Sequence, residues 1–217
     1  MIRGSSAGEH AEVADVKTDL KKTVDGYRAR RGEFRILDLP ETRYLAVDGS
    51  GDPNTAPEYR AAVEALYSLA YAVKFAAREA LGRDHVVPPL EGLWWAGDLD
   101  AFTSRRNKDA WEWTMMIAVP SWIPDEIVGI AREKAGERSV GVELRALAEG
   151  TCVQTLHVGP YDDEGPVIAA MHGHALAAGY RLAGVHHEIY LSDPRRTAPE
   201  RLRTILRQPV TAASTAL

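Results

Sequence analysis

Polar or aromatic and aliphatic side chains alternate with a period of two from Glu188 to Ser192, which is the period of a β-strand. One face of this strand carries three polar or aromatic side chains: Glu188, Tyr190 and Ser192. The other face carries two aliphatic side chains, Ile189 and Leu191. Asp193-Pro194 ends the strand, because proline lacks a backbone N–H and aspartate favours turns. The pattern predicts a strand whose aliphatic face packs in the core and whose polar face meets either a cleft or water.

A second predicted strand, which also ends at an aspartate, lies earlier in the chain, from Pro89 to Asp98. When Asp98 is aligned with Asp193, Trp95 matches Tyr190. Each of the two strands follows a helix, and each helix follows a strand that ends in glycine: Tyr44–Gly49 and Val153–Gly159. The repeated order predicts a duplicated unit, and binding grooves commonly form where two such units meet.

The longest predicted helix runs from Glu58 to Leu81, with apolar side chains at helical spacing. Beside the apolar stripe lies a second stripe, spaced so that its members share a face: Tyr67, Tyr71, Lys74 and Arg78. Such a stripe either covers the rim of the core or forms one wall of a ligand cleft. A third strand, from Trp111 to Pro120, alternates with Trp111 and Trp113 on one face.

The remaining pattern completes a single domain from residue 16 to 210, with halves at about 33–120 and 140–210. We expect residues 1–15 to be mobile and 211–217 to fray. The other predicted elements are a short helix at Val16–Tyr27, an edge strand at Glu33–Leu39, a helix at Pro124–Lys134, a strand at Gly141–Leu147, a helix from Pro166 to about Ala178, and a strand at Leu202–Val210.

Composition narrows the class of protein. The 217-residue chain has a formal net charge of −5, which predicts no nucleic-acid partner. Its apolar runs are shorter than a membrane span and its start lacks a hydrophobic signal region, so we expect a cytoplasmic protein with no membrane partner. Cys152 is the one cysteine and excludes an internal disulfide. Its place in an apolar run predicts a buried thiol rather than a nucleophile.

Candidate chemistry centres on aromatic side chains and one carboxylate. Four of the five tryptophans lie in two predicted strands, which favours a stacking surface for a flat organic ligand over a purely structural role. The histidine spacings match no metal motif, so we expect neither a metal nor a cofactor. Glu188 faces the same side as Tyr190. It could act as a general base, or as the counter-ion of a cationic ligand that the rings also attract.

The duplicated unit and the strings PLEGLWW, WEWTMM and HHEIYLSDPRR resemble the GyrI-like small-molecule-binding proteins over about Lys17 to Val210. The resemblance implies an α+β fold: two strand–helix–strand–strand units form a concave antiparallel sheet backed by helices, with a ligand cleft between the halves. Relatives include effector-binding domains of multidrug-responsive regulators. The branch with EGLWW and HEIYLSDPRR is similar to proteins that hydrolyse cyclopropanoid DNA-alkylating natural products of the yatakemycin type.

This branch implies a role for each matching residue. Glu188 would activate water to open a strained cyclopropane, and Tyr71 would stabilise the oxyanion that forms. Seven side chains are expected to contact a flat aromatic ligand: Trp94, Trp95, Trp111, Trp113, Tyr190, Tyr67 and His157. The alternative is a non-catalytic protein that sequesters cationic aromatic drugs. Chemical conversion of the bound ligand distinguishes the two functions, whereas affinity alone does not.

Overall fold

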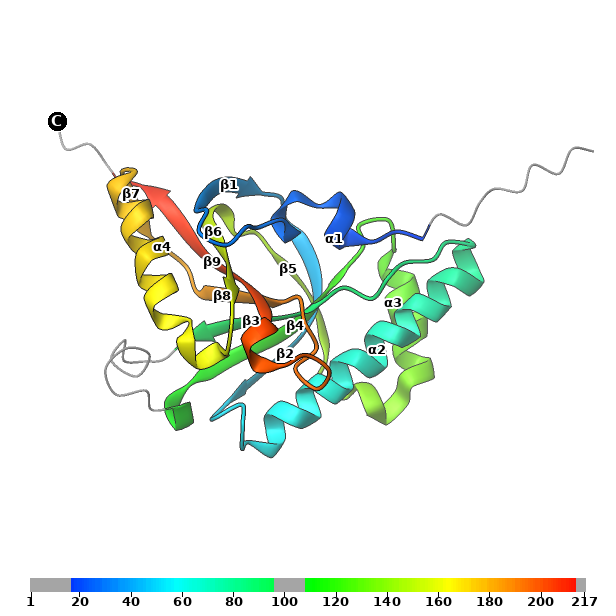
Figure 1. The fold of residues 1–217 in the computed structure, drawn as a ribbon. Coiled ribbons are helices and arrows are strands. Elements are labelled where there is room, and N and C mark those ends of the chain that lie inside the picture. Colours follow the sequence, from blue (N-terminus) through cyan, green and yellow to red (C-terminus); the bar gives the residue numbers. More distant parts are fainter. Residues whose placement is uncertain (1–16, 96–107, 214–217) are drawn as a thin grey trace, which may run out of the picture.

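The computed structural model describes residues 17–95 and 108–213 and has an α+β architecture (Figure 1). Nine strands form one antiparallel sheet: β1 (Arg35–Leu39), β2 (Thr42–Ser50), β3 (Leu90–Trp95), β4 (Glu112–Val119), β5 (Glu143–Leu147), β6 (Gly150–Val158), β7 (Tyr180–Leu182), β8 (His186–Tyr190) and β9 (Arg203–Ala212). The described helices are α1 (Leu20–Thr23), α2 (Pro57–Leu81), α3 (Asp125–Ala135) and α4 (Gly165–Ala177). Short 3₁₀ turns include η1 (Asp25–Tyr27) and η5 (Tyr161–Asp163).

The order of strands across the sheet confirms the duplication. It runs β1-β6-β9-β8-β3-β4-β2-β5, and β7 pairs with the end of β9. The order reads the same from both ends when β1, β2, β3 and β4 are matched with β5, β6, β8 and β9. The first strand of each half pairs with the second strand of the other half, so β1 lies beside β6 and β5 beside β2. The two halves therefore exchange their edge strands.

The two halves meet at the β3–β8 pair, whose register corrects the sequence alignment. Gly92 lies opposite Glu188 and Trp94 lies opposite His186. Residues opposite each other share a face of the sheet, and here their residue numbers differ by an even number. Positions that correspond in the two halves must therefore also have residue numbers that differ by an even number. Aligning Asp98 with Asp193 gives an odd difference, and a one-residue slip turns every side chain to the other face. Trp94, not Trp95, shares the face of Glu188. Asp98 itself lies outside the described residues.

One face of the sheet, here called the helix face, is covered by α2, α3 and α4 (Figure 1). The apolar stripe of α2 is buried there as predicted, for example at Leu66, Leu69 and Val73. It packs with α3 on residues of β2, β3 and β4: Leu45, Trp94, Trp113, Met115 and Ile117. α4 packs through Met171 and Ala175 on β6 and β9. Burial of these two stripes fixes both helices on the same side as Glu188.

The opposite face of the sheet is covered by the N-terminal segment, which is not the single helix predicted over Val16–Tyr27. α1 ends early because Val24 adopts extended dihedral angles, φ −103° and ψ 125°. The chain then brings Gly26 close to the sheet. A Cβ on Gly26 would lie 3.0 Å from Leu39 Cδ2 and 3.1 Å from Arg207 Nη2. Because η1 packs closely on the sheet, the segment does not form one continuous helix.

Most predicted elements are confirmed within one or two residues. α2 was expected at 58–81 and is Pro57–Leu81, and β1 is the predicted edge strand. Gly179 follows α4 with φ +84°, as the expected C-terminal glycine. The expected tail began at residue 211, but β9 continues to Ala212, where β7 pairs with it; residues 1–15 and 214–217 lie outside the described residues. No described helix is long and apolar enough to span a membrane.

Candidate functional site

The candidate site lies on the helix face around Glu188, close to the axis that relates the two halves. The alternation expected for β8 is confirmed, since His187 and Ile189 are buried on the other side. Two rows of opposed residues cross the central strands here. Tyr190 lies between Thr204 of β9 and Leu90 of β3, and Glu188 lies between Leu206 and Gly92. The site therefore combines side chains from both halves of the duplicated fold.

A chain of hydrogen bonds orients the Glu188 carboxylate. The Trp94 indole Nε1–H donates to the Tyr190 hydroxyl at 2.9 Å, and that hydroxyl donates to Glu188 Oε2 at 2.8 Å. His186 Nε2 lies 3.5 Å from the other carboxylate oxygen, Oε1. Since a phenol has one proton to donate, Tyr190 uses it on Glu188 and accepts from Trp94. The carboxylate is held in one orientation by a residue on its own strand.

Gly92 makes room for this chain of hydrogen bonds. A Cβ at this position would lie 2.7 Å from Trp94 Nε1, 3.1 Å from the Tyr190 hydroxyl and 3.2 Å from Met115 Sδ. Real Cβ atoms do not approach an indole nitrogen so closely. The absence of a side chain at residue 92 therefore allows Trp94 and Tyr190 to meet over β3, beside Glu188.

Aromatic rings from α2, β3, η5 and β8, together with Trp111, lie around the carboxylate. The Tyr59 ring of α2 stacks on Trp94 with centroids 6.3 Å apart, and Trp111 meets Trp94 edge to face at 5.6 Å. Tyr161 of η5 meets Tyr190 edge to face at 5.7 Å. Offset and edge-to-face arrangements are the favoured geometries of aromatic pairs. These rings give the site the apolar, planar surfaces that a flat ligand requires.

The phenols of this cluster stay protonated at neutral pH. Burial is the main cause, and the nearby charge of Glu188 adds to it: together they raise the pKa of Tyr190 and Tyr59 well above the usual value. The pKa of Tyr161 is raised to about 12, again chiefly by burial. Neutral phenols are hydrogen-bond donors, so the site offers O–H groups to an oxygen that gains negative charge.

A second carboxyl group, Glu164, lies beside Glu188. It directly precedes α4 and is buried. Burial, with the charge of Glu188 as a second cause, raises the pKa of Glu164 to about 10. A neighbouring negative charge disfavours ionisation. Glu164 is therefore held as the neutral acid at neutral pH.

Tyr71 and Tyr67 lie along α2, away from the hydrogen bonds of Glu188. Tyr71 is 48% exposed, and its ring contacts Tyr67 at 6.5 Å and Phe75 at 6.4 Å. Lys74, considered as a ligand-facing ammonium, instead forms an ion pair with Asp84 and donates to the His85 carbonyl at 2.5 Å. That part of the predicted polar stripe ties α2 to the following loop.

The tryptophans separate into different environments. Trp94 and Trp111 belong to the aromatic cluster around Glu188. Trp113 is fully buried in the core, where its ring packs over Gly49 and against Tyr59. Trp95 points to the opposite face of the sheet and donates to Glu112.

His157, expected to contact a ligand, is buried opposite Thr204. Its Nε2 lies 3.0 Å from the Pro160 carbonyl oxygen. This contact ties His157 to the turn that leads into η5, which carries Tyr161.

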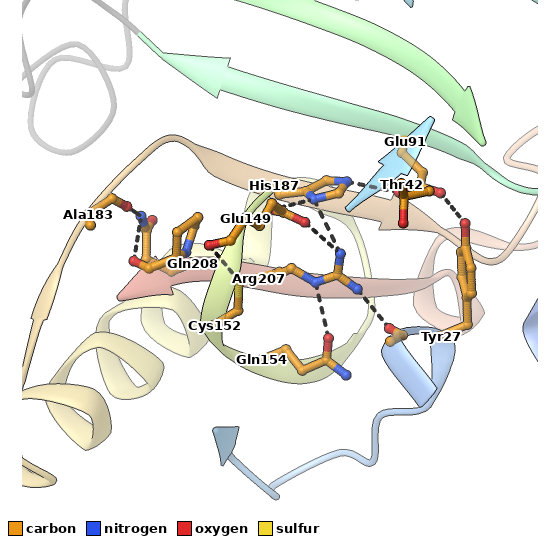
Figure 2. A network of polar contacts seen from close by, with 12 residues as sticks. Tyr27, Thr42, Glu91, Glu149, Cys152, Gln154, Ala183, His187, Arg207 and Gln208 are labelled. Atoms are coloured by element: carbon orange, nitrogen blue, oxygen red, sulfur yellow. Dashed lines mark hydrogen bonds and ion pairs between the residues drawn. The ribbon is translucent and has the colours of Figure 1, made fainter. Parts of the chain in front are cut away.

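A different polar cluster, around His187, occupies the opposite face of the sheet (Figure 2). His187 bridges two carboxylates, with Nε2 3.0 Å from Glu91 and Nδ1 2.9 Å from Glu149. Arg207 donates to Glu149 at 2.9 Å and to the Gly26 carbonyl at 2.8 Å. Tyr27 donates to Glu91 at 2.5 Å. These contacts attach η1 to the central strands, and we call the group the buried ionic network.

Two openings in the described surface border this network. One has a volume of about 260 Å³ and includes Leu93, Glu149 and Pro209 in its lining; the other, of about 50 Å³, is lined in part by Tyr27 and Tyr44. Glu149, which lines both openings, is already paired with His187 and Arg207. Among the described residues, no group of histidine, cysteine and acidic side chains has the arrangement of a metal site.

The sequence patterns did not single out Tyr59, Tyr161 or Glu164. Tyr59 lies eight residues before Tyr67, so the helical spacing of that stripe could have been extended by about two turns towards the N-terminus. Glu164 and Tyr161 belong to an acidic loop, and the signal there is Pro166, which marks the start of a helix directed at the sheet. No local signal connects this loop with Glu188.

Comparison with known proteins identifies a family and several solved structures that this chain resembles. The GyrI-like small molecule binding domain matches residues 32–211. An uncharacterized conserved protein from Listeria innocua is 37% identical, with a TM-score of 0.81 over 90% of this chain and 100% of that chain. Two structures of a hydrolase from Listeria innocua show the same identity and coverage, with TM-scores of 0.78 and 0.76.

A more distant structure, the C-terminal domain of EcmrR, shares the fold at 12% identity, with a TM-score of 0.52 over 83% of this chain and 98% of that domain. No curated protein matches the chain. The family match spans both halves of the sheet and all the residues around Glu188, and relatives at 37% identity cover nearly the whole chain. The chain therefore belongs to the GyrI-like family of small-molecule-binding domains.

Proposed function

We propose that this protein binds flat aromatic small molecules beside Glu188 and hydrolyses a strained cyclopropane of the kind found in DNA-alkylating natural products. The observation that carries the proposal is a carboxylate held by Tyr190 and surrounded by the rings of Tyr59, Trp94 and Tyr161. Relatives that are 37% identical over 90% of the chain are hydrolases, which supports a catalytic role. The reaction would serve detoxification or self-resistance.

In the proposed reaction, Glu188 takes a proton from water as the water oxygen bonds to the ring CH₂. The C–C bond of the cyclopropane breaks, and its electron pair moves through the conjugated ring to the carbonyl oxygen. Neighbouring rings exclude bulk water, and a phenol O–H stabilises the oxyanion. We assign that donor to Tyr59 in preference to Tyr71, because Tyr59 lies within the aromatic cluster and Tyr71 is half exposed.

The test is incubation with a spirocyclopropyl dienone alkylator, with product analysis by mass spectrometry. We expect the mass of one added water in the product. Glu188→Gln keeps the shape of the side chain but removes the basic oxygen, so turnover should fall by roughly two to four orders of magnitude. Affinity for the neutral ligand, measured by quenching of tryptophan fluorescence, should change little. Unchanged turnover in Glu188→Gln would contradict the role of Glu188.

Two matched phenylalanine variants complete the experiment. Tyr59→Phe removes a hydroxyl inside the cluster, and Tyr71→Phe removes one from the same helix outside it. Loss of an oxyanion donor costs about 100-fold or more in turnover. We expect that loss in Tyr59→Phe and near-normal turnover in Tyr71→Phe. The reverse result would return the donor role to Tyr71.

A second candidate function is the sequestration of cationic aromatic drugs without conversion. Among the described residues, neither lysine nor arginine forms an ion pair with Glu188, which supports this function. The surrounding rings also attract cations. In that case no water is added to the dienone. Glu188→Gln then weakens a cationic aromatic ligand by about 1–3 kcal/mol and leaves a neutral one unaffected.

A further inference from the structure

Buried polar atoms without a hydrogen-bond partner are concentrated where α4 covers the sheet. Nine such side-chain atoms occur among the described residues. Six of them lie on α4, directly before it, or on the sheet face beneath it, and they belong to Thr155, Glu164, His172, His186 and Thr204. Unpartnered polar atoms are uncommon in protein interiors, and each requires a specific explanation.

The strand register places the two threonine hydroxyls beside Glu188. Thr204 of β9 lies opposite Tyr190, whose hydroxyl orients Glu188. Thr155 of β6 lies opposite Leu206, and Leu206 lies opposite Glu188 in turn. Thr204 is two residues from Leu206, so both point to the face on which α4 packs. Thr155 is 1% exposed and Thr204 is fully buried.

Further unpartnered groups come from β8 and from α4. His186 lies two residues before Glu188 and shares its face, with Nε2 3.5 Å from Glu188 Oε1. Neither ring nitrogen of His186 makes a hydrogen bond with another described residue. Glu164 and His172 contribute one unpartnered atom each from the start and the middle of α4. Helix and sheet therefore both direct unused hydrogen-bonding groups into this region.

The first half of the fold has core side chains at the positions equivalent to the two hydroxyls. β2 and β6 both have nine residues, and alignment of their ends matches Val47 with Thr155. The pairing of the strands likewise matches Trp113 with Thr204. Val47 and Trp113 pack in the hydrophobic core under α2. The same fold thus tolerates apolar side chains here, so the hydroxyls of the second half are not a requirement of the architecture.

The unpartnered groups on the α4 side are uncharged at neutral pH. Burial lowers the pKa of His172 and raises the pKa of Glu164 to about 10. The threonine hydroxyls both donate and accept hydrogen bonds. Neutral donors and acceptors beside one carboxylate suit an uncharged polar group better than an anion.

We propose that Thr155, Thr204 and His186 form a polar subsite that binds an uncharged hydrogen-bonding group of the ligand, such as a carboxamide. The flat ring system of the ligand would stack among the aromatic side chains beside Glu188. A ligand without such a group leaves the buried hydroxyls unpaired and is bound more weakly. The proposal rests on the proposed binding of flat aromatic ligands and is independent of their hydrolysis.

Thermal unfolding of the free protein tests whether the hydroxyls are unpartnered. Thr155→Val and Thr204→Val replace a hydroxyl by a methyl group of similar size, so each should raise Tm by about 2–4 °C. Thr114→Val is the matched control, because buried Thr114 donates to Asp48 Oδ1 at 2.6 Å. Its Tm should fall. A similar fall in Thr155→Val and Thr204→Val would show that protein groups already pair with both hydroxyls, and it overturns the proposal.

Ligand preference tests the subsite itself. The probes are two spirocyclopropyl dienones that differ only in one substituent, a carboxamide or an isopropenyl group of the same shape. Quenching of tryptophan fluorescence should show that the wild type binds the carboxamide at least about tenfold more tightly. The double variant Thr155→Val/Thr204→Val should bind the two nearly equally, and Thr114→Val should keep the preference.

Equal affinities in the wild type, or a preference that survives the double substitution, overturn the subsite. Equal slowing of both conversions by the valine substitutions, with the preference unchanged, also overturns it, because the hydroxyls would then hold water for either ligand. Mass spectrometry of the same samples tests hydrolysis separately. A wild type that prefers the carboxamide but adds no water to it contradicts the proposed hydrolysis and supports the subsite.

Discussion

Gly92 shows how much of this site depends on a residue that has no side chain. It lies opposite Glu188 in the central strand pair, and the indole of Trp94 and hydroxyl of Tyr190 meet above it. Tyr190 in turn orients Glu188. At the residue scale, a glycine in a strand weakens the strand but allows close approach of other groups. Here the groups that approach are those of the candidate site.

We predict that Gly92→Ala disrupts the site more than the fold. The new Cβ would lie 2.7 Å from Trp94 Nε1, and an indole packed among other rings moves only with its neighbours. Overpacking of this kind costs about 1–3 kcal/mol in unfolding free energy. Ligand affinity and turnover should both fall, measured by tryptophan fluorescence and product analysis.

Gly129→Ala on α3 is the matched control, since a Cβ there meets nothing within 4 Å. It should leave ligand binding unchanged and stabilise the helix by up to about 1 kcal/mol. Normal ligand binding in Gly92→Ala would contradict the importance of the Trp94–Tyr190 contact.

At the scale of elements, β8 carries two different kinds of chemistry on its two faces. Glu188 faces aromatic rings, and its neighbour His187 lies in the buried ionic network (Figure 2). In that network the proximity of His187, together with Arg207, outweighs burial and lowers the pKa of Glu149 to about 2. The network connects η1, β3, β8 and β9. It therefore fixes the strand that carries Glu188 from behind.

Arg207→Met should be strongly destabilising, because it leaves Glu149 buried with only His187 to balance its charge and frees the Gly26 carbonyl. Breaking a buried ion pair on one side typically costs 3–5 kcal/mol, here about that much in the free energy of unfolding. Chemical denaturation measures it. Arg203→Met on the same strand is the control; Arg203 is exposed, so its change should stay within about 0.5 kcal/mol. Equal stabilities of the two variants would show that the network contributes little.

At the scale of the whole molecule, the exchanged edge strands make the halves interdependent. β1 of the first half pairs only with β6 among the described strands, and β5 pairs only with β2. Neither half can complete its sheet alone. The central β3–β8 pair adds a direct connection, and Glu188 lies on it.

We therefore expect one cooperative unfolding transition. Fluorescence of the tryptophans reports mainly on the first half, which contains Trp94 and Trp113, and labelling of the buried Cys152 thiol reports on the second half. The two probes should give the same denaturant midpoint. Labelling of Cys152 at distinctly lower denaturant concentration would show that the halves unfold separately.

The sequence by itself determined the elements and the face of each side chain relative to its own element. Helical spacing predicted α2 within one residue, and alternation predicted that Glu188 and Tyr190 share a face. Together with its motifs, the chain also indicated the family and a duplicated fold. The elements and their faces follow from local periodicity, because the side chains of a helix or strand repeat at 3.6 or 2 residues whatever surrounds them.

Only the tertiary structure decided which faces meet. The register of β3 against β8 placed Trp94 rather than Trp95 beside Glu188, and the docking of α4 brought Glu164 to the same carboxylate. The buried ionic network likewise joins Gly26 to Arg207, which are far apart along the chain. Pairing between strands and helix docking are set by the sum of many non-local contacts. A shift of one residue reverses every face, and local pattern contains no information about that shift.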